Sequence, residues 1–263
     1  MKFIYKERID NKRVVHIGPI KVVYYKKQPA PKPQFTFDDS NAIYRTDFLN
    51  EENIKITNQA KNKDYIGILN SILSNTGNAD MFTDEYIENR YGMKLILDDI
   101  LNKPKDLVVF DIACGSGSLI KTISQHGYKT VGVDINPYRV LRCRNAGLET
   151  HFAFSENIPL PDNSADIIVS QETLEHVCDI ELTLQEMNRL LKPGGEIYIQ
   201  VPYKDMVDCQ NHVRLFDENT LKRMLKKYFE IKSCEIIPYL TTEKPNNIFV
   251  KAKSIKKLHR MKS

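Results

Sequence analysis

Two carboxylates near the ends of short apolar runs are the residues best placed to do chemistry. Asp111 lies in the run Leu107–Ile112, which leads into the small-residue segment Ala113–Ser118. Asp134 ends the next run, 23 residues further on. Small residues let a backbone approach a ligand closely, and the N-terminus of a following helix supplies free N–H groups. Because a carboxylate at the end of the neighbouring strand can accept hydrogen bonds from ribose hydroxyls, this spacing predicts a nucleoside-containing ligand.

Other groups suited to catalysis follow two later apolar runs, residues 165–169 and 196–201. The first run is followed by Glu172, Glu175, His176 and Cys178, and the second by Tyr203, Asp205, Asp208, Cys209 and His212. Histidine titrates near neutral pH and can remove a proton from a hydroxyl. We therefore expect catalysis from His212, His176 or Glu172, and substrate contacts from Tyr203 and Asp205. The two histidines and two cysteines could converge as a Cys₂His₂ zinc site, but the His-x-Cys spacing is unusual for one, and no metal site is predicted.

Alternating strand and helix patterns must position these groups. Apolar β-rich runs predict strands at 107–112, 130–133, 165–169, 196–201, 230–239 and 246–252. Helical spacing predicts helices at 118–126, 137–146, 180–192 and 217–229, and one more that begins after a capping Thr83. Repeated strand–helix units predict an α/β fold with a doubly wound, parallel sheet.

The chain is expected to have three parts. Residues 1–82 are predicted to be an N-terminal extension, with a β-hairpin around Gly18-Pro19, a stiff proline-rich linker at 28–33 and a polar, weakly helical stretch that could act as a lid. Residues 83–252 are predicted to be the α/β domain. Residues 253–263 are predicted to be a solvated basic tail.

Composition excludes several classes of protein. The 263 residues are 41% hydrophobic and 27% charged, which is ordinary for a folded chain and unlike a disordered or disulfide-rich one. A net charge of +4 is too small to indicate nucleic-acid binding, so no stable nucleic-acid complex is expected. No apolar run approaches the roughly 18 residues of a membrane span, and the N-terminus lacks a signal-peptide core. Five scattered cysteines predict reduced thiols in the cytoplasm.

Four motifs in this order resemble the class I S-adenosylmethionine-dependent methyltransferases over residues 83–250. They are Val109–Ser118, Val131–Asp134, Glu156–Ser170 with Leu174–Val177, and Leu190–Ile199. A nicotinamide oxidoreductase fits less well, because Ile120 stands where the dinucleotide fingerprint has its third glycine. The resemblance implies a Rossmann-like, seven-stranded, mostly parallel sheet with an antiparallel last strand. It also implies S-adenosyl-L-methionine as the cofactor.

The resemblance implies a role for each matching residue. Asp111 would organise the glycine loop, Asp134 would hold the ribose hydroxyls, and Ile135 would pack on the adenine. Close backbone approach to the methionine and ribose parts would come from Ala113, Gly115 and Gly117. Phe154 stands where the family often has an acid that bonds the adenine amine, so Phe154 is expected to stack on the base, with a polar contact from Ser155. Gln171 is expected near the methionine part. Arg90 and Tyr91, before the first strand, could touch the cofactor carboxylate or cover the site, and packing or solvation is the alternative.

The acceptor is expected to lie between the loops after the fourth and fifth strands, which are neighbours in the family's strand order. His176 and His212 would then flank it. The run Ile17–Lys27 resembles N-terminal stretches of bacterial enzymes of surface-polysaccharide assembly. That likeness favours O-methylation of a sugar, a sugar nucleotide or a related capsule precursor. Another small molecule or RNA as the acceptor, and a binding module without catalysis, are the alternatives.

Overall fold

The computed structural model describes residues 87–204, 212 and 214–256, together with the backbone of short strands at 4–9, 12–17, 20–25 and 43–44. The chain divides into two compact units, residues 1–41 and 42–263. In the first unit, β1 (Ile4–Ile9), β2 (Lys12–Ile17) and β3 (Ile20–Tyr25) form an antiparallel sheet. The predicted hairpin is β2–β3, and β1 was not predicted.

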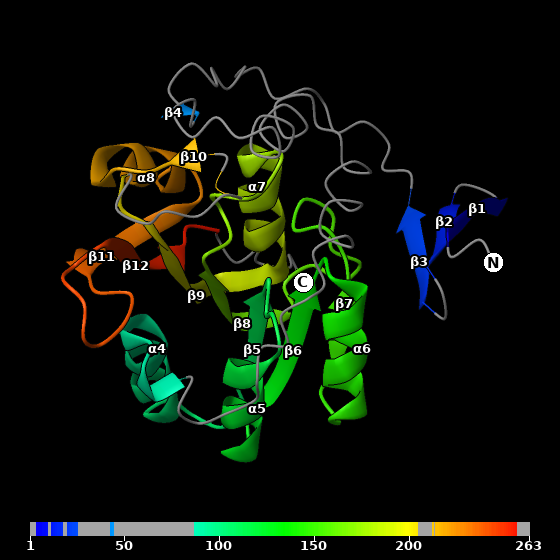
Figure 1. The fold of residues 1–263 in the computed structure, drawn as a ribbon, viewed down its shortest axis with the longest axis horizontal. Helices are drawn as coiled ribbons and strands as arrows, with labels where there is room; N and C mark the ends of the chain where they lie inside the picture. The colour runs from blue at the N-terminus through cyan, green and yellow to red at the C-terminus, as the bar shows by residue number, and fades with distance from the viewer. Residues whose placement is uncertain are drawn as a thin grey trace, which may run out of the picture. The chain divides into compact units, whose positions relative to one another are not determined.

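One seven-stranded sheet organises the second unit, in the order β11-β12-β9-β8-β5-β6-β7 (Figure 1). The strands β5 to β9 that belong to it pair in parallel, whereas β12 runs antiparallel to both β9 and β11. The predicted doubly wound sheet with an antiparallel last strand is therefore confirmed. The strands are β5 (Val108–Ile112), β6 (Lys129–Asp134), β7 (Thr150–Phe152), β8 (Ala165–Gln171), β9 (Leu191–Pro202), β11 (Phe229–Ile237) and β12 (Asn247–Ser254).

The strand order places a ligand edge at the middle of the sheet. The chain enters at β5, continues outward through β6 and β7, and then crosses back to β8 on the other side of β5. Helices that connect strands in opposite directions leave a crevice at the carboxyl ends of those strands. The carboxyl ends of β5 and β8 therefore mark the expected position of the site.

Helices cover both faces of this sheet. They are α4 (Tyr91–Leu101), α5 (Ser118–Gln125), α6 (Pro137–Asn145), α7 (Ile180–Leu190) and α8 (Glu218–Leu225). In Figure 1, α4 and α5 lie on the opposite side of the strands from α7 and α8. Ile96 and Ile100 of α4 pack with Leu119 and Ile123 of α5 against the buried Val109 of β5. This core holds the β5–α5 loop against the sheet.

Short polar side chains set several helix starts. Asn136 accepts hydrogen bonds from the backbone N–H groups of Tyr138 and Arg139, and Pro137 occupies the first turn of α6. Asp179 and Asp217 cap α7 and α8 in the same way. Such caps satisfy N–H groups that have no partner within the helix.

The structure differs from the sequence expectations at three places. Ile87 and Glu88 are helical, but the start of this helix and its predicted cap, Thr83, lie outside the described residues. The helix is interrupted at Arg90, which has an extended backbone and forms a β-bridge with Leu240, and α4 begins at Tyr91. The Pro193-Gly194-Gly195 segment, expected as a turn before the strand, lies within β9, where the register with β8 shifts. The short strand β7 was not predicted from its own residues.

A small antiparallel pair joins distant parts of the second unit. Strand β10 (Arg214–Leu215) pairs with β4 (Ile43–Tyr44). Within the part of the chain that the structure describes, no helix combines the length and apolar character needed to cross a membrane. The predicted boundaries at residues 82 and 252 stay predictions.

Candidate active site

The glycine loop begins with backbone in the left-handed region. Ala113, Gly115 and Gly117 have φ values of 66°, 57° and 82°. The N–H groups of Ala113 and Cys114 both donate to the carbonyl of Val133, at 2.7 and 3.0 Å. These bonds fold the loop over the end of β6. A left-handed conformation is costly for alanine, so Ala113 is held in a strained backbone state directly at the site.

Asp134 connects the two strands that the sequence singled out. Its Oδ2 accepts a hydrogen bond from the Gly115 N–H at 2.8 Å, and its Oδ1 accepts one from the Asn136 N–H at 2.7 Å. The side chain is buried, with 4% of its surface exposed. Asp134 therefore fixes the glycine loop as well as presenting a carboxylate at the end of β6.

A pocket of about 150 Å³ opens at the carboxyl edge of β5. Six residues that the sequence singled out line it: Arg90, Asp111, Ala113, Gly115, Gln171 and Glu172. The rest of the lining comes from α4, the glycine loop, the start of α5, α6, β9 and the segment after β11. These residues are Met93, Cys114, Ser116, Ser118, Leu119, Arg139, Gln200 and Tyr239.

Several predicted cofactor contacts lie away from this lining. A Cβ at Gly117 would come within 2.8 Å of Cys143 Sγ, so Gly117 is needed for packing against α6. Phe154 is buried beyond the end of β7, and Ser155 donates a hydrogen bond to Glu156. For Gly117, Asp134, Ile135, Phe154 and Ser155, contact with the cofactor stays a prediction.

Asp111 places a buried carboxyl on the pocket wall. Burial, together with the smaller effect of the nearby Asp134 charge, raises the pKa of Asp111 to about 7. The carboxyl is therefore close to half ionised near neutral pH. A cationic group bound in the pocket would stabilise the ionised form.

Asp111→Asn should stabilise the protein without ligand at alkaline pH. The folded pKa of about 7 lies above the ordinary 3.8, so stability is lost as pH rises through this window. About 1.4 kcal/mol per pKa unit gives a gain of at most about 4 kcal/mol at pH 8, which vanishes near pH 4. Thermal denaturation at pH 4, 6 and 8 measures it, with exposed Asp98→Asn as the control. A gain that does not depend on pH would contradict this origin.

Glu172 is held at the pocket by two amides. Gln200 donates to Glu172 Oε1 at 3.3 Å, and Asn247 donates to the same oxygen at 2.5 Å. Burial raises the pKa of Glu172 to about 8, against the opposing effect of Arg90 and the amides. Its backbone has a φ of 50°, a second strained position at the site.

Sequence reasoning missed the residues that come from distant strands. Gln200 belongs to no motif that the sequence analysis used. In the structure it donates a hydrogen bond to Glu172 and accepts one from Gln171 at 3.0 Å. The guanidinium of Arg90 lies 4.3 Å from the centre of the Tyr239 ring. Arg90 was predicted near the cofactor, but no sequence signal pointed to Gln200, Asn247 or Tyr239, because strand neighbours bring them there.

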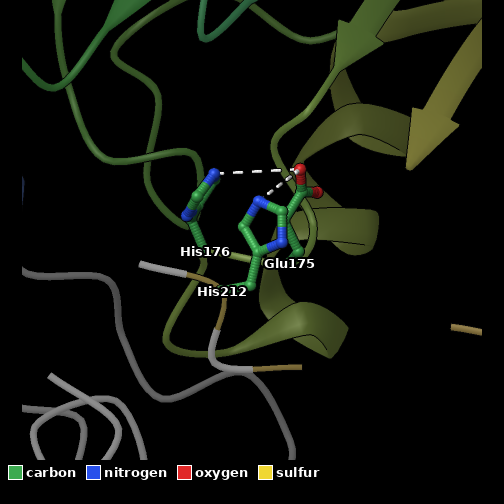
Figure 2. Close-up of side chains that lie close together, drawn as sticks. All are labelled: Glu175, His176 and His212. Carbon is green, nitrogen blue, oxygen red and sulfur yellow. Dashed lines mark ion pairs between the residues drawn. The ribbon is translucent and has the colours of Figure 1, made fainter. Parts of the chain in front are cut away.

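The two predicted histidines meet at a third residue, Glu175 (Figure 2). His176 Nε2 lies 3.8 Å from Glu175 Oε1, and His212 Nε2 lies 3.9 Å from the same oxygen. The two rings are in edge contact, with their centres 4.9 Å apart. Burial and the charge of Glu172 raise the pKa of Glu175 well above its usual range. Glu175 was named among the residues after the fourth strand in the sequence analysis, but no role was predicted for it.

Buried side chains hold this cluster in place. Arg214 on β10 donates to the carbonyls of Val177 and Cys178, which ties the segment of His212 to the loop after β8. Glu156 accepts hydrogen bonds from the N–H groups of Cys178 and Asp179, at 2.9 and 3.1 Å. The loop of Glu175 and His176 is thus fixed from two directions.

The predicted substrate residues follow β9. Tyr203 donates its N–H to the Asn246 carbonyl at 2.9 Å and bridges to Phe216, so it lies next to the β10 segment. Asp205, like Cys209 of the alternative zinc site, lies outside the described residues. Substrate contact by Tyr203 and Asp205 stays a prediction.

The same region is similar to known methyltransferases. Residues 110–199 match the family described as a methyltransferase domain. Norajmaline N-methyltransferase of Rauvolfia serpentina is 33% identical over 114 residues, which are 40% of this chain and 38% of that protein. A ubiquinone biosynthesis O-methyltransferase of Chelativorans sp. (strain BNC1) is 29% identical over 121 residues, 43% of this chain and 48% of that protein.

The fold also matches solved structures. The crystal structure of an S-adenosylmethionine-dependent methyltransferase from Mesorhizobium loti superposes with a TM-score of 0.53 and 18% identity. The match covers 62% of this chain and 97% of that one. The chain spans less than half the length of the two curated relatives, so these similarities concern the central domain.

Proposed function

We propose that this chain, which carries a methyltransferase domain of the S-adenosylmethionine-dependent kind, methylates a hydroxyl oxygen of a small molecule. The observation that carries the proposal is the pocket at the carboxyl edge of β5. A glycine loop, the buried Asp111, the partly buried Glu172 and Arg90 line it. That combination suits a ligand that bears cationic groups, a carboxylate and a ribose.

The pocket residues fit the charges of S-adenosylmethionine. The carboxyl of Asp111 faces the pocket and would bind the ammonium group of the methionine part, and Arg90 would bind its carboxylate. The backbone of Ala113 and Gly115 leaves room for close approach. Asp134 at the end of β6 would accept hydrogen bonds from the ribose hydroxyls, and Ile135, Phe154 and Ser155 would contact the adenine, as the family resemblance implies.

The cofactor supplies an activated methyl group, so the chain must align the acceptor and bind its oxygen. Gln171 ends β8 and Glu172 follows it directly; both line the pocket, and the loop of Glu175 and His176 comes next in the chain. The acceptor hydroxyl would be bound by His212 and His176, beyond Glu172. These side chains would hold the oxygen in line with the transferred methyl group.

The identity of the acceptor is proposed from two sources. The relatives include a ubiquinone biosynthesis O-methyltransferase, which supports a hydroxyl on a small molecule. A sugar, sugar nucleotide or capsule precursor is the narrower proposal, and it rests on the N-terminal sequence resemblance. Residues 1–82, as an acceptor-binding extension, would then decide between these classes.

Calorimetric titration with S-adenosylhomocysteine tests the cofactor, with NADH as the control ligand. We expect micromolar binding of the former alone, because the loop lacks the third glycine of the dinucleotide fingerprint. Binding of NADH alone, or of neither ligand, would contradict the proposal. If S-adenosylhomocysteine binds, methyl transfer from labelled S-adenosylmethionine to phenols, sugars and nucleotide sugars identifies the acceptor class.

A further inference from the structure

We infer that Glu175, His176 and His212 form a binding site for a divalent transition-metal ion. The potential ligand atoms of these three residues all lie within 4.8 Å of one another. They come from two segments, the loop after β8 and the residues just before β10. The presence of the site is independent of the proposed function, whereas the role of the ion in catalysis rests on it.

The distances suit a single ion between the three side chains. Metal–nitrogen and metal–oxygen bonds of about 2.1 Å place two ligands of a tetrahedral site about 3.4 Å apart. The observed separations of 3.8 and 3.9 Å from Glu175 Oε1 exceed that value by about half an ångström. In Figure 2, both rings direct a nitrogen toward this oxygen. A small inward shift of the side chains would complete the coordination.

The state of Glu175 is the observation that calls for a cation. Its side chain is fully buried, and neither carboxylate oxygen has a hydrogen-bond partner among the described residues. Burying a carboxylate without hydrogen bonds is costly, and a bound cation removes that cost. Two other acids nearby differ, since the buried Glu156 accepts two backbone N–H groups and the partly buried Glu172 accepts two side-chain amides.

The donor set selects the class of ion. Two imidazole nitrogens and one carboxylate oxygen suit Zn²⁺, Mn²⁺ or Fe²⁺ rather than Ca²⁺ or Mg²⁺, which prefer oxygen ligands. This ligand set keeps the two histidines of the Cys₂His₂ site weighed in the sequence analysis and has Glu175 in place of the two cysteines. Cys178 instead contributes its backbone N–H and carbonyl to Glu156 and Arg214.

The site is closed on one side and open on the other. Glu175 and His212 are buried, but 38% of the His176 side chain is exposed. Three protein ligands with an open position are typical of catalytic rather than structural metal sites. The open position would bind the acceptor hydroxyl as its oxyanion, since a bound cation favours loss of the proton to solvent. The oxygen would then form a bond to the methyl carbon while the carbon–sulfur bond breaks with its electron pair on sulfur.

The test is titration of Zn²⁺ and Mn²⁺ into the full chain, prepared without a histidine tag and treated with a chelator. We expect one ion per chain, and a higher melting temperature when it is bound. Glu175→Gln keeps the shape of the side chain and should weaken metal binding by roughly 100-fold or more. The variant should bind S-adenosylhomocysteine within about twofold of the wild-type chain, which shows that it is folded.

His151→Gln is the matched control. His151 lies 3.6 Å from Glu149, a histidine–carboxylate pair of similar separation without a third ligand. The His151→Gln substitution should leave the metal affinity unchanged. Absence of metal binding in a wild-type chain that binds S-adenosylhomocysteine would overturn the inference and leave the proposed function standing. Equal metal binding by Glu175→Gln would also overturn it. Metal binding without S-adenosylhomocysteine binding would instead overturn the proposed function alone.

Discussion

Asp134→Ala should bind S-adenosylhomocysteine at least about tenfold more weakly than the wild-type chain, a loss of about 1.4 kcal/mol or more. Two effects combine in this substitution. The ribose hydroxyls lose a charged acceptor, and such hydrogen bonds contribute about 1.5–3 kcal/mol. The Gly115 N–H also loses its partner at 2.8 Å, so the glycine loop is no longer tied to β6. Calorimetric titration measures the affinity.

Asp166→Ala is the matched control for this loss. Asp166 on β8 also accepts a backbone hydrogen bond, from the Val108 N–H at 2.9 Å, but at the opposite edge of the sheet. Its removal should lower the melting temperature without changing the affinity for S-adenosylhomocysteine. Unchanged affinity in Asp134→Ala would remove this carboxylate from the cofactor site.

His212→Ala should lower kcat by roughly 10²-fold or more, with the affinity for S-adenosylhomocysteine nearly unchanged. The residue belongs to the acceptor side of the site, because its ring contacts His176 and Glu175 and does not line the pocket at β5. The substitution therefore removes a group that binds the reacting oxygen, either directly or through the inferred metal ion, and leaves the cofactor contacts in place. Methyl transfer is measured once the acceptor class has been found.

His126→Ala is the control for the histidine substitution. His126 lies exposed at the C-terminus of α5, where its ring contacts the carbonyl of Thr122. It should retain full activity. A kcat for His212→Ala that equals the wild-type value would show that this ring does not act on the acceptor, whatever its place in the cluster.

Short-range patterns explain why much of the domain could be predicted. A buried strand, a tight loop and a helix start are all coded within about ten residues, so Asp111 and the glycine loop were found from local sequence. Asp134 follows from the next strand by the same argument. The alternation of strands and helices then places the carboxyl ends of the parallel strands at one edge of the sheet, whatever the order of the strands.

Contacts between elements far apart in the chain could not be predicted in this way. Gln200 and Asn247 reach Glu172 only because β9 lies between β8 and β12. No local pattern states which strands will be neighbours. The polar network around Glu172, which sets the ionisation of the pocket, is therefore a product of strand order.

Residue type and local spacing were enough to predict the class of fold, the glycine loop and the two histidines as candidates. The role of Glu175 could be recognised only from the folded structure. Its importance comes from complete burial and from the absence of a hydrogen-bond partner among the described residues, and both depend on what surrounds the side chain. Spacing along the chain gives no measure of burial. Glu175 could therefore be assigned to the cluster only from the contact between the loop after β8 and the segment before β10.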